Sequence, residues 1–188
     1  MIRFALIDAP ASEPVTLNEA KAHARIRHDR DDAYINTLIA VARRKAEFDT
    51  GRALAIQRWT ATLDRWPAAE SGEAFRRLAL FPHNPSAIVS LTVDGVTIAA
   101  DLAVLRGGEA WIAAGVAESA ATMGGGIVLC FDAGALDAND LPSFKLAMAM
   151  NVAYWYENRE AARTDGAWPA ISAFGYDALI QPFKVLAL

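Results

Sequence analysis

Histidines and clustered acids are the first side chains in this sequence that could bind a metal. The histidines are His23, His28 and His83. The first two are five residues apart, and this spacing does not align two ligands on one turn of a helix. The acidic run at 29–32 lacks the glycine and the terminal glutamate of a calcium loop, so solvated acids at a helix start are the simpler interpretation. We therefore predict no metal site.

Nucleophilic and phosphate-binding patterns are equally weak. Cys130 lies in the apolar run 126–131, which is typical of a buried structural thiol rather than a nucleophile. The glycines at 124–126 precede an expected strand and do not open a helix, so they do not form a dinucleotide fingerprint. The basic run at 43–45 could contact phosphate, but a solvated helix surface is the commoner case. No catalytic or cofactor-binding residue is predicted, and no cofactor.

The composition indicates a globular chain with a sizeable core. The 188 residues are 54% hydrophobic and 21% charged, with a net charge of −4. This balance lacks the basic excess of tight nucleic-acid binders. Neither a signal peptide nor a run of membrane-spanning length is recognised, so we expect synthesis in the bacterial cytoplasm and no membrane partner.

Three helices are predicted from capping signals and apolar periodicity, near 16–26, 31–50 and 141–163. Thr16 and Glu19 form a capping box for the first helix. The second helix ends at Gly51, a suitable left-handed cap. Its predicted buried stripe contains Ile35, Leu38, Ile39, Ala42 and Ala46, widened by Tyr34, Val41 and Phe48. The third helix is apolar around most of its circumference and should be covered from several sides.

The middle of the chain reads as short strands separated by turns. Residues 56–66 alternate in polarity, 87–93 is a clear strand, and Asp94-Gly95 signals a hairpin. Further strands are expected near 102–105, 110–113 and 126–131, whereas 1–15 reads as an extended lead-in and 68–77 as a polar connection. The predicted fold is α+β: a helical body made of 1–53 and 141–188, with an inserted antiparallel β-rich subdomain at 54–140.

The C-terminal end is unusually apolar for a terminus. It contains the residues Phe183, Lys184, Val185, Leu186 and Leu188. From the residues alone, this segment either folds back on the core or docks into another chain.

Three motifs carry a family resemblance. They are Glu13-Pro14-Val15-Thr16-Leu17-x-Glu19-Ala20-Lys21, the helix at 31–50 followed by Gly51-Arg52-Ala53-Leu54, and a motif near the end of the last long helix. That last motif is Tyr154-x-Tyr156-Glu157-Asn158-Arg159-Glu160, and Trp155 at its unspecified position is expected to pack in the core. The chain thereby resembles the head–tail connector (adaptor) proteins of long-tailed phages, prophages and gene transfer agents.

The resemblance implies a structural role. Connectors of this family form a ring of about a dozen copies beneath the portal, bridge it to a stopper or tail-completion protein, and leave a channel for DNA. It implies that the partners are the portal protein, the stopper and further copies of the chain. DNA is expected to pass through the channel without specific binding. It also implies that residues 183–188 dock on the portal, that the mature location is the head–tail junction of a phage-like particle, and that no catalysis occurs.

Two alternatives stay open at this stage. The first is a small cytoplasmic DNA-binding regulator that uses the first two helices. The second is a small enzyme with an unrecognised site, for which the β-rich insertion would form a pocket wall.

Overall fold

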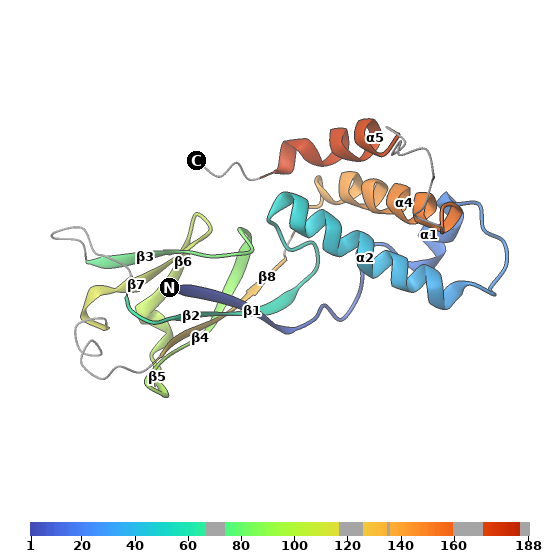
Figure 1. Cartoon of the computed structure of the whole chain (residues 1–188). Coiled ribbons are helices and arrows are strands. Elements are labelled where there is room, and N and C mark those ends of the chain that lie inside the picture. The colour runs from blue at the N-terminus through green and yellow to red at the C-terminus, as the bar shows by residue number, and fades with distance from the viewer. Residues whose placement is uncertain (67–73, 117–125, 135, 160–170, 185–188) are drawn as a thin grey trace. The chain divides into compact units, whose positions relative to one another are not determined.

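The computed structural model describes residues 1–66, 74–116, 126–134, 136–159 and 171–184 (Figure 1). The chain forms two compact units. A sheet unit contains residues 1–11 and 55–135, and a helical unit contains residues 12–54 and 136–188. The fold is α+β as predicted, with antiparallel strands inserted between helices. The structure differs from the expected division at residues 1–11, which lie with the strands.

The sheet unit is built on a five-stranded antiparallel sheet of order β1-β2-β8-β4-β5. Its strands are β1 (Ile2–Asp8), β2 (Gln57–Leu63), β4 (Pro85–Val93), β5 (Val96–Ile98) and β8 (Ile127–Ala133). β8 lies at the centre, and every second side chain along it is buried, including Leu129 and Phe131. This alternation places one face of the sheet on the core and leaves the other more open to solvent.

Two turn positions need a backbone conformation that only particular residues adopt, and the first is the hairpin predicted at Asp94-Gly95. Asp94 and Gly95 both have positive φ, 52° and 80°, and join β4 to β5. This is the backbone conformation that a two-residue hairpin requires. Gly134, just after β8, has φ 112°, and a side chain there would overlap the backbone of Ala55. Only glycine therefore suits this position.

A second, three-stranded antiparallel sheet has the order β3-β7-β6. Its strands are β3 (Phe75–Ala79), β6 (Ala103–Arg106) and β7 (Glu109–Ala113), with the short 3-10 helix η1 (Ala100–Leu102) before β6. β6, β7 and β8 confirm strands expected near those positions. β3 was not expected, because the prediction extended the polar connection to residue 77.

The lead-in at residues 1–15 is extended over residues 2–8 as predicted, but it pairs as a strand, which was not foreseen. Residues 2–8 form β1, an edge strand that pairs antiparallel with β2 from Ile2–Leu63 to Asp8–Arg58. Edge strands need bury little apolar surface, so their sequences carry a weak alternation signal. The prolines at positions 10 and 14 lie beyond the end of this strand.

The helical unit contains α1 (Leu17–His23), α2 (Asp32–Thr50), α4 (Leu141–Glu157), α5 (Ile171–Ile180) and the 3-10 turn η2 (Gln181–Phe183). α4 lies between α2 and α5 (Figure 1). α1 ends three residues earlier than predicted. The long helix was predicted to run to 163, but α4 ends at Glu157 with Asn158 as its C-cap, and residues 160–163 lie outside the described residues. None of the described helices is both long and apolar enough to cross a membrane.

The core of this unit joins the faces that the helical periodicity assigned to α2 and α4. Ile35 and Ile39 of α2 are fully buried together with Phe144, Met148 and Val152 of α4. Burying such side chains supplies about 1.5–3 kcal/mol each, which is the main favourable term for a unit of this size. α5 adds Tyr176 and Ile180 to the same core.

Candidate docking surfaces

The capping box of α1 is present as predicted. Thr16 Oγ1 accepts the backbone N–H of Glu19 at 3.2 Å, and Glu19 Oε2 accepts the backbone N–H of Thr16 at 2.7 Å. Lys145 of α4 donates to the other Glu19 oxygen at 2.7 Å. The bond from Lys145, followed by those from Thr16, lowers the pKa of Glu19 to about 2. Both motif residues therefore stabilise the helix start.

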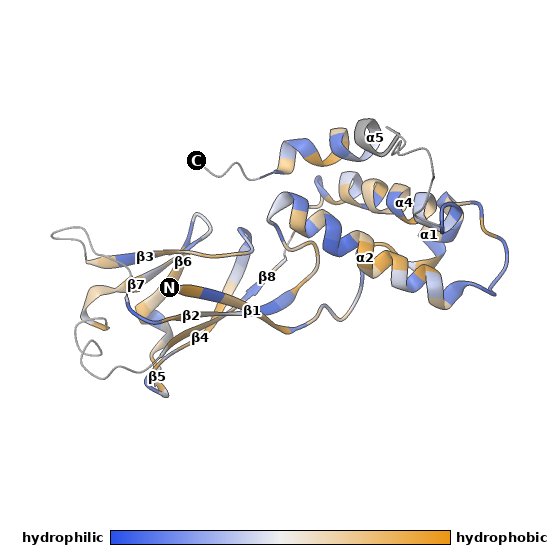
Figure 2. Cartoon of the chain, viewed as in Figure 1, coloured by the Kyte–Doolittle hydropathy of each residue, from blue (hydrophilic) through white to orange (hydrophobic). Residues whose placement is uncertain are grey.

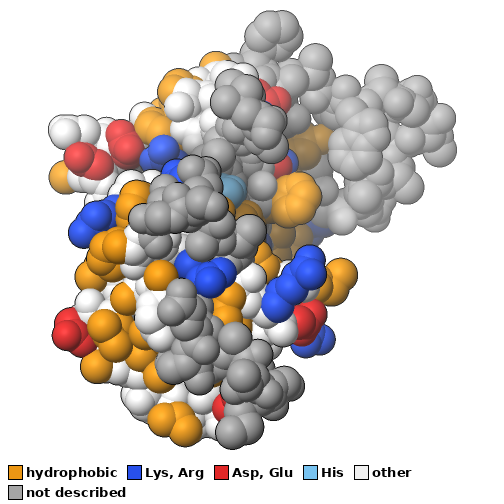
Figure 3. Space-filling model, turned by 90° about the vertical axis from the view of Figure 1, so that its left-hand side faces the viewer, with side chains coloured by type: hydrophobic (Ala, Val, Ile, Leu, Met, Phe, Trp, Pro, Cys, Tyr) orange, Lys and Arg blue, Asp and Glu red, His pale blue; other side chains and the backbone are white. Residues whose placement is uncertain are grey.

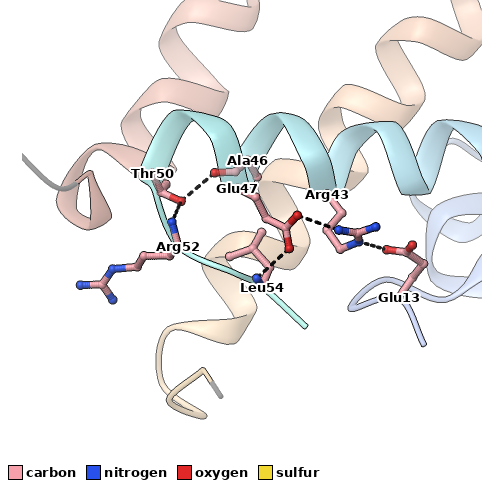
Figure 4. A network of polar contacts seen from close by, with 7 residues as sticks. All are labelled: Glu13, Arg43, Ala46, Glu47, Thr50, Arg52 and Leu54. Atoms are coloured by element: carbon pink, nitrogen blue, oxygen red, sulfur yellow. Dashed lines mark hydrogen bonds and ion pairs between the residues drawn. The ribbon is translucent and has the colours of Figure 1, made fainter. Parts of the chain in front are cut away.

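Buried Arg43 connects residues of the motifs that lie before α1 and along α2 (Figure 4). Arg43 is 4% exposed, and its guanidinium donates to Glu13 at 2.7 Å and to Glu47 at 2.6 Å. Glu47 also accepts the backbone N–H of Leu54 at 3.0 Å. One buried ion-pair network thus ties the segment before α1 and the segment after α2 to the same helix.

This network corrects the interpretation of the basic run at 43–45 as a solvated surface. Arg44 and Lys45 are exposed as predicted, and Lys45 pairs with Asp49 at 2.8 Å, so the correction concerns Arg43 alone. Gly51 caps the helix in the left-handed region, with φ 68°, as predicted. Thr50 donates its hydroxyl to the Ala46 carbonyl at 2.7 Å.

The motif at the end of α4 locks this helix to the start of α2. Asp31 accepts the Tyr156 hydroxyl at 2.6 Å and Arg159 at 2.7 Å. The Arg159 guanidinium also lies 4.8 Å from the ring centres of both Tyr34 and Tyr156. The hydrogen bonds from Tyr156 and Arg159 lower the pKa of Asp31, and the same carboxylate raises the pKa of Tyr156.

The other residues of that motif have smaller roles. Trp155 is partly buried against the core, as expected. Asn158 caps the helix by donating its side-chain amide to the Tyr154 carbonyl at 2.8 Å. Glu157 is exposed. The motif therefore combines a structural lock with one solvent-facing acid.

The start of the C-terminal segment folds back on the chain's own core. The Phe183 ring lies 4.7 Å from the Phe144 ring, centre to centre, and Lys184 forms an ion pair with Asp177 at 3.4 Å. Val185, Leu186 and Leu188, which were predicted to dock on the portal, lie outside the described residues. α5 is held in turn by Tyr176, whose hydroxyl donates to Asp49 at 2.7 Å. Burial, followed by this bond, raises the pKa of Tyr176 well above its ordinary value.

Two apolar side chains of α2 are exposed, contrary to the predicted stripe. Val41 is 44% exposed and Phe48 is 86% exposed. The five central residues of the stripe are buried as predicted, and Tyr34 is partly buried. Figure 2 shows hydrophobic and hydrophilic stretches alternating along α2. Val41 and Phe48 lie on the side of the helix opposite the core, which the apolar count alone does not reveal.

The described residues contain no cluster of metal ligands. The acids at 29–32 are used in ion pairs: Lys21 contacts Asp29 at 2.6 Å and Asp32 at 2.7 Å. Burial raises the pKa of the half-buried Cys130 thiol, which disfavours the reactive thiolate.

The small sheet carries an arginine–aromatic cluster that the sequence analysis missed. Arg106 lies 5.2 Å from the Trp111 ring centre and 5.4 Å from that of Phe75, and Arg77 lies 5.6 Å from Trp111. Arg77 of β3 and Trp111 of β7 are cross-strand partners. Figure 3 views the molecule from the side on which these strands lie in Figure 1. The described side chains visible there mix basic, acidic and hydrophobic types without a continuous basic patch. Such a surface is not typical of tight nucleic-acid binding.

Comparison with known proteins identifies what these two units resemble. Residues 14–95 match the family model described as phage gp6-like head-tail connector protein. This match covers α1, α2 and the chain as far as the β4–β5 turn. The expected resemblance to head–tail connectors is confirmed. No curated protein matches.

Solved structures extend the likeness to almost the whole chain. A chain of the "Neck of empty GTA particle computed with C6 symmetry" has a TM-score of 0.71 and 20% identity, covering 99% of this chain and 97% of that one. A chain of the "Virion of native gene transfer agent (GTA) particle" gives 0.69 and 20%, covering 98% and 96%. A chain of the "Neck of native GTA particle computed with C12 symmetry" gives 0.62 and 22%, covering 98% and 97%. The connector-like fold therefore includes both units.

Proposed function

We propose that this chain is a structural head–tail connector of a phage-like particle or gene transfer agent. Copies form a ring under the portal, link it to the stopper or tail-completion protein, and leave a channel for DNA. The observation that carries this proposal is the likeness to chains of gene transfer agent necks and of a virion over 98–99% of the sequence, at TM-scores of 0.62–0.71. The match of residues 14–95 to a connector family model supports it independently.

The residues of the shared motifs support a structural role in this proposal. Glu13, Arg43 and Glu47 fasten the segments that flank α1 and α2, and Asp31 and Tyr156 fasten α2 to α4. In each case the polar groups satisfy one another and hold helices in place. A catalytic site instead needs a nucleophile or base directed at a substrate position. We propose that the chain performs no catalysis and acts by binding other proteins.

The C-terminal residues 185–188 are proposed to dock on the portal protein. Phe183 and Lys184 are held by Phe144 and Asp177, so they serve as the anchor of the proposed docking segment. These four residues, Val185-Leu186-Ala187-Leu188, are all apolar. Short apolar segments of this kind gain affinity by filling hydrophobic pockets of a partner.

A pull-down with the portal protein encoded in the same genome tests this function. The full chain should retain the portal, and a chain ending at Lys184 should retain at least tenfold less. A matched variant, Leu186→Asp with Leu188→Asp, keeps the chain length and should behave like the truncated chain. If all three chains retained equal amounts of portal, the proposed docking role of residues 185–188 would be rejected. Absence of portal binding by the full chain would overturn the connector proposal itself.

A further inference from the structure

The helical unit exposes three large apolar side chains within its described residues: Val41, Phe48 and Leu146, at 44%, 86% and 44%. Single exposed apolar residues are common on protein surfaces and need no explanation. These three, however, lie on two helix faces whose charged neighbours have opposite signs. The combination of an exposed aromatic ring, apolar neighbours and arginine is typical of residues that dominate protein–protein binding.

The first surface, the α2 face, consists of Val41, Arg44, Phe48 and Arg52. Val41, Arg44 and Phe48 are spaced by three and four residues, which places them on one side of a helix. Arg52 follows the Gly51 cap, and its side chain extends away from the buried network in Figure 4. Within the described residues neither arginine forms an ion pair, so this apolar surface carries two positive charges.

The second surface, the α4 face, consists of Asp137, Asp140, Pro142 and Leu146. Asp137 is exposed and Asp140 half-exposed, and they form a turn at the start of α4, where the backbone N–H of Asp140 donates to the Asp137 carbonyl at 3.1 Å. Asp140 makes no side-chain capping bond. Within the described residues neither carboxylate forms an ion pair, so this apolar surface carries two negative charges.

The two faces lie on different helices of the helical unit. The buried residues of α2 and of α4 share one core, and each exposed face lies on the side of its helix opposite to those residues. The two faces also lie at the same end of the helix pair. α2 and α4 run antiparallel, because Asp31 at the start of α2 contacts Tyr156 at the end of α4. Counted at about 1.5 Å per residue from that contact, Phe48 is level with Asp140 at the start of α4, and Leu146 is level with Val41.

We propose that the α2 face of one copy binds the α4 face of the next copy. The inference rests on the proposed ring and names the surfaces that build it. A ring needs two different, mutually complementary patches on each subunit, whereas a two-fold dimer uses one patch twice. A two-fold contact through the α2 face would place arginines against arginines, which like-charge repulsion opposes. Two different faces of opposite charge suit neighbours that stand side by side around an axis.

Cysteine cross-linking tests the pairing directly. All variants carry Cys130→Ala to remove the native thiol. Phe48→Cys and Leu146→Cys chains, mixed and oxidised, should give a disulfide dimer in at least fivefold excess over either chain alone. A mixture of Phe48→Cys with Val96→Cys, at a position of β5 that is more exposed than Leu146 (65% against 44%), is the control and should give no excess. The chain carrying both Phe48→Cys and Leu146→Cys should give a ladder of oligomers.

Charge exchange tests the electrostatic part. Arg44→Asp and Asp140→Arg should each lower the yield of the 48–146 cross-link about fivefold, and one chain carrying both should recover it. Arg25→Asp, at an exposed position outside both faces, should leave the yield unchanged. Equal dimer yield in mixed and separate samples, or dimers from Phe48→Cys alone, would overturn the proposal.

The same samples, imaged with bound portal, separate this inference from the proposed function. A ring on the portal without the 48–146 cross-link would leave the connector function intact and reject these two faces. Portal that carries no ring would reject the connector function itself.

Discussion

Replacing Arg43 with methionine tests the network that holds the flanks of α1 and α2 together. Arg43 is 4% exposed and balances Glu13 and Glu47 at 2.7 Å and 2.6 Å. Removing one member of a buried ion pair costs about 3–5 kcal/mol, because the remaining charge stays buried without compensation. The side chain of Glu13 is 29% exposed and can regain water, so the lower end, about 3 kcal/mol, is expected.

The measurement is thermal and urea unfolding followed by circular dichroism at 222 nm, which reports mainly on the helical unit. A loss of 3 kcal/mol corresponds to a fall in Tm of roughly 6–12 °C for a chain of this size. Arg44→Met is the matched control, because it removes the same charge from a neighbouring but exposed position. It should change stability by less than about 0.5 kcal/mol.

A double variant separates charge from packing. Glu47→Gln keeps an oxygen to accept the Leu54 N–H but removes the charge that Arg43→Met leaves unpaired. The chain with both changes should therefore recover about 1–2 kcal/mol relative to Arg43→Met alone. If Arg43→Met and Arg44→Met were equally stable, the network would contribute nothing and the reasoning from burial would be refuted.

Three further predictions concern other contacts. The pKa of Glu19 is about 2 in the folded chain, below its ordinary value of 4.5, so its stabilising effect is complete above pH 4.5 and is lost as the pH falls towards 2. The difference in stability between the wild type and Glu19→Gln, measured by urea unfolding, should shrink over that interval, and a constant difference would contradict this. Gly134→Ala should destabilise the sheet unit by about 2–3 kcal/mol, because the added methyl meets the Ala55 carbonyl at a positive φ; unchanged near-ultraviolet circular dichroism and Tm would argue against this. Tyr156→Phe should cost about 1–2 kcal/mol by removing the hydroxyl bound to Asp31, and a neutral result in chemical unfolding would show that this bond adds nothing.

Much of the fold could be predicted because its signals are local. The capping box at Thr16 and Glu19, the left-handed Gly51 and the hairpin at Asp94–Gly95 each require a particular residue at a particular backbone position. The two helix faces that form the core could be predicted from their spacing. β1 was missed because an edge strand with one partner needs no strong alternation.

The docking surfaces were harder to predict because burial depends on tertiary contacts. Arg43 was assigned to the solvent as part of a basic run, although it shares the stripe of Ile39, Ala46 and Thr50, and this spacing is the signal that could have identified it. Phe48 was assigned to the core because hydropathy does not distinguish a side chain buried in its own fold from one exposed for a partner. Phe183 was predicted to dock on another chain, and its packing on Phe144 depends on the path of α5, which no local pattern specifies.

Electron microscopy of the purified chain mixed with its portal protein tests the connector function most directly. The account predicts a closed, rotationally symmetric ring of this chain at one end of the portal, with an open central channel. The account would be contradicted if portal particles carried no added density for this chain, even at chain concentrations well above those used in the pull-down.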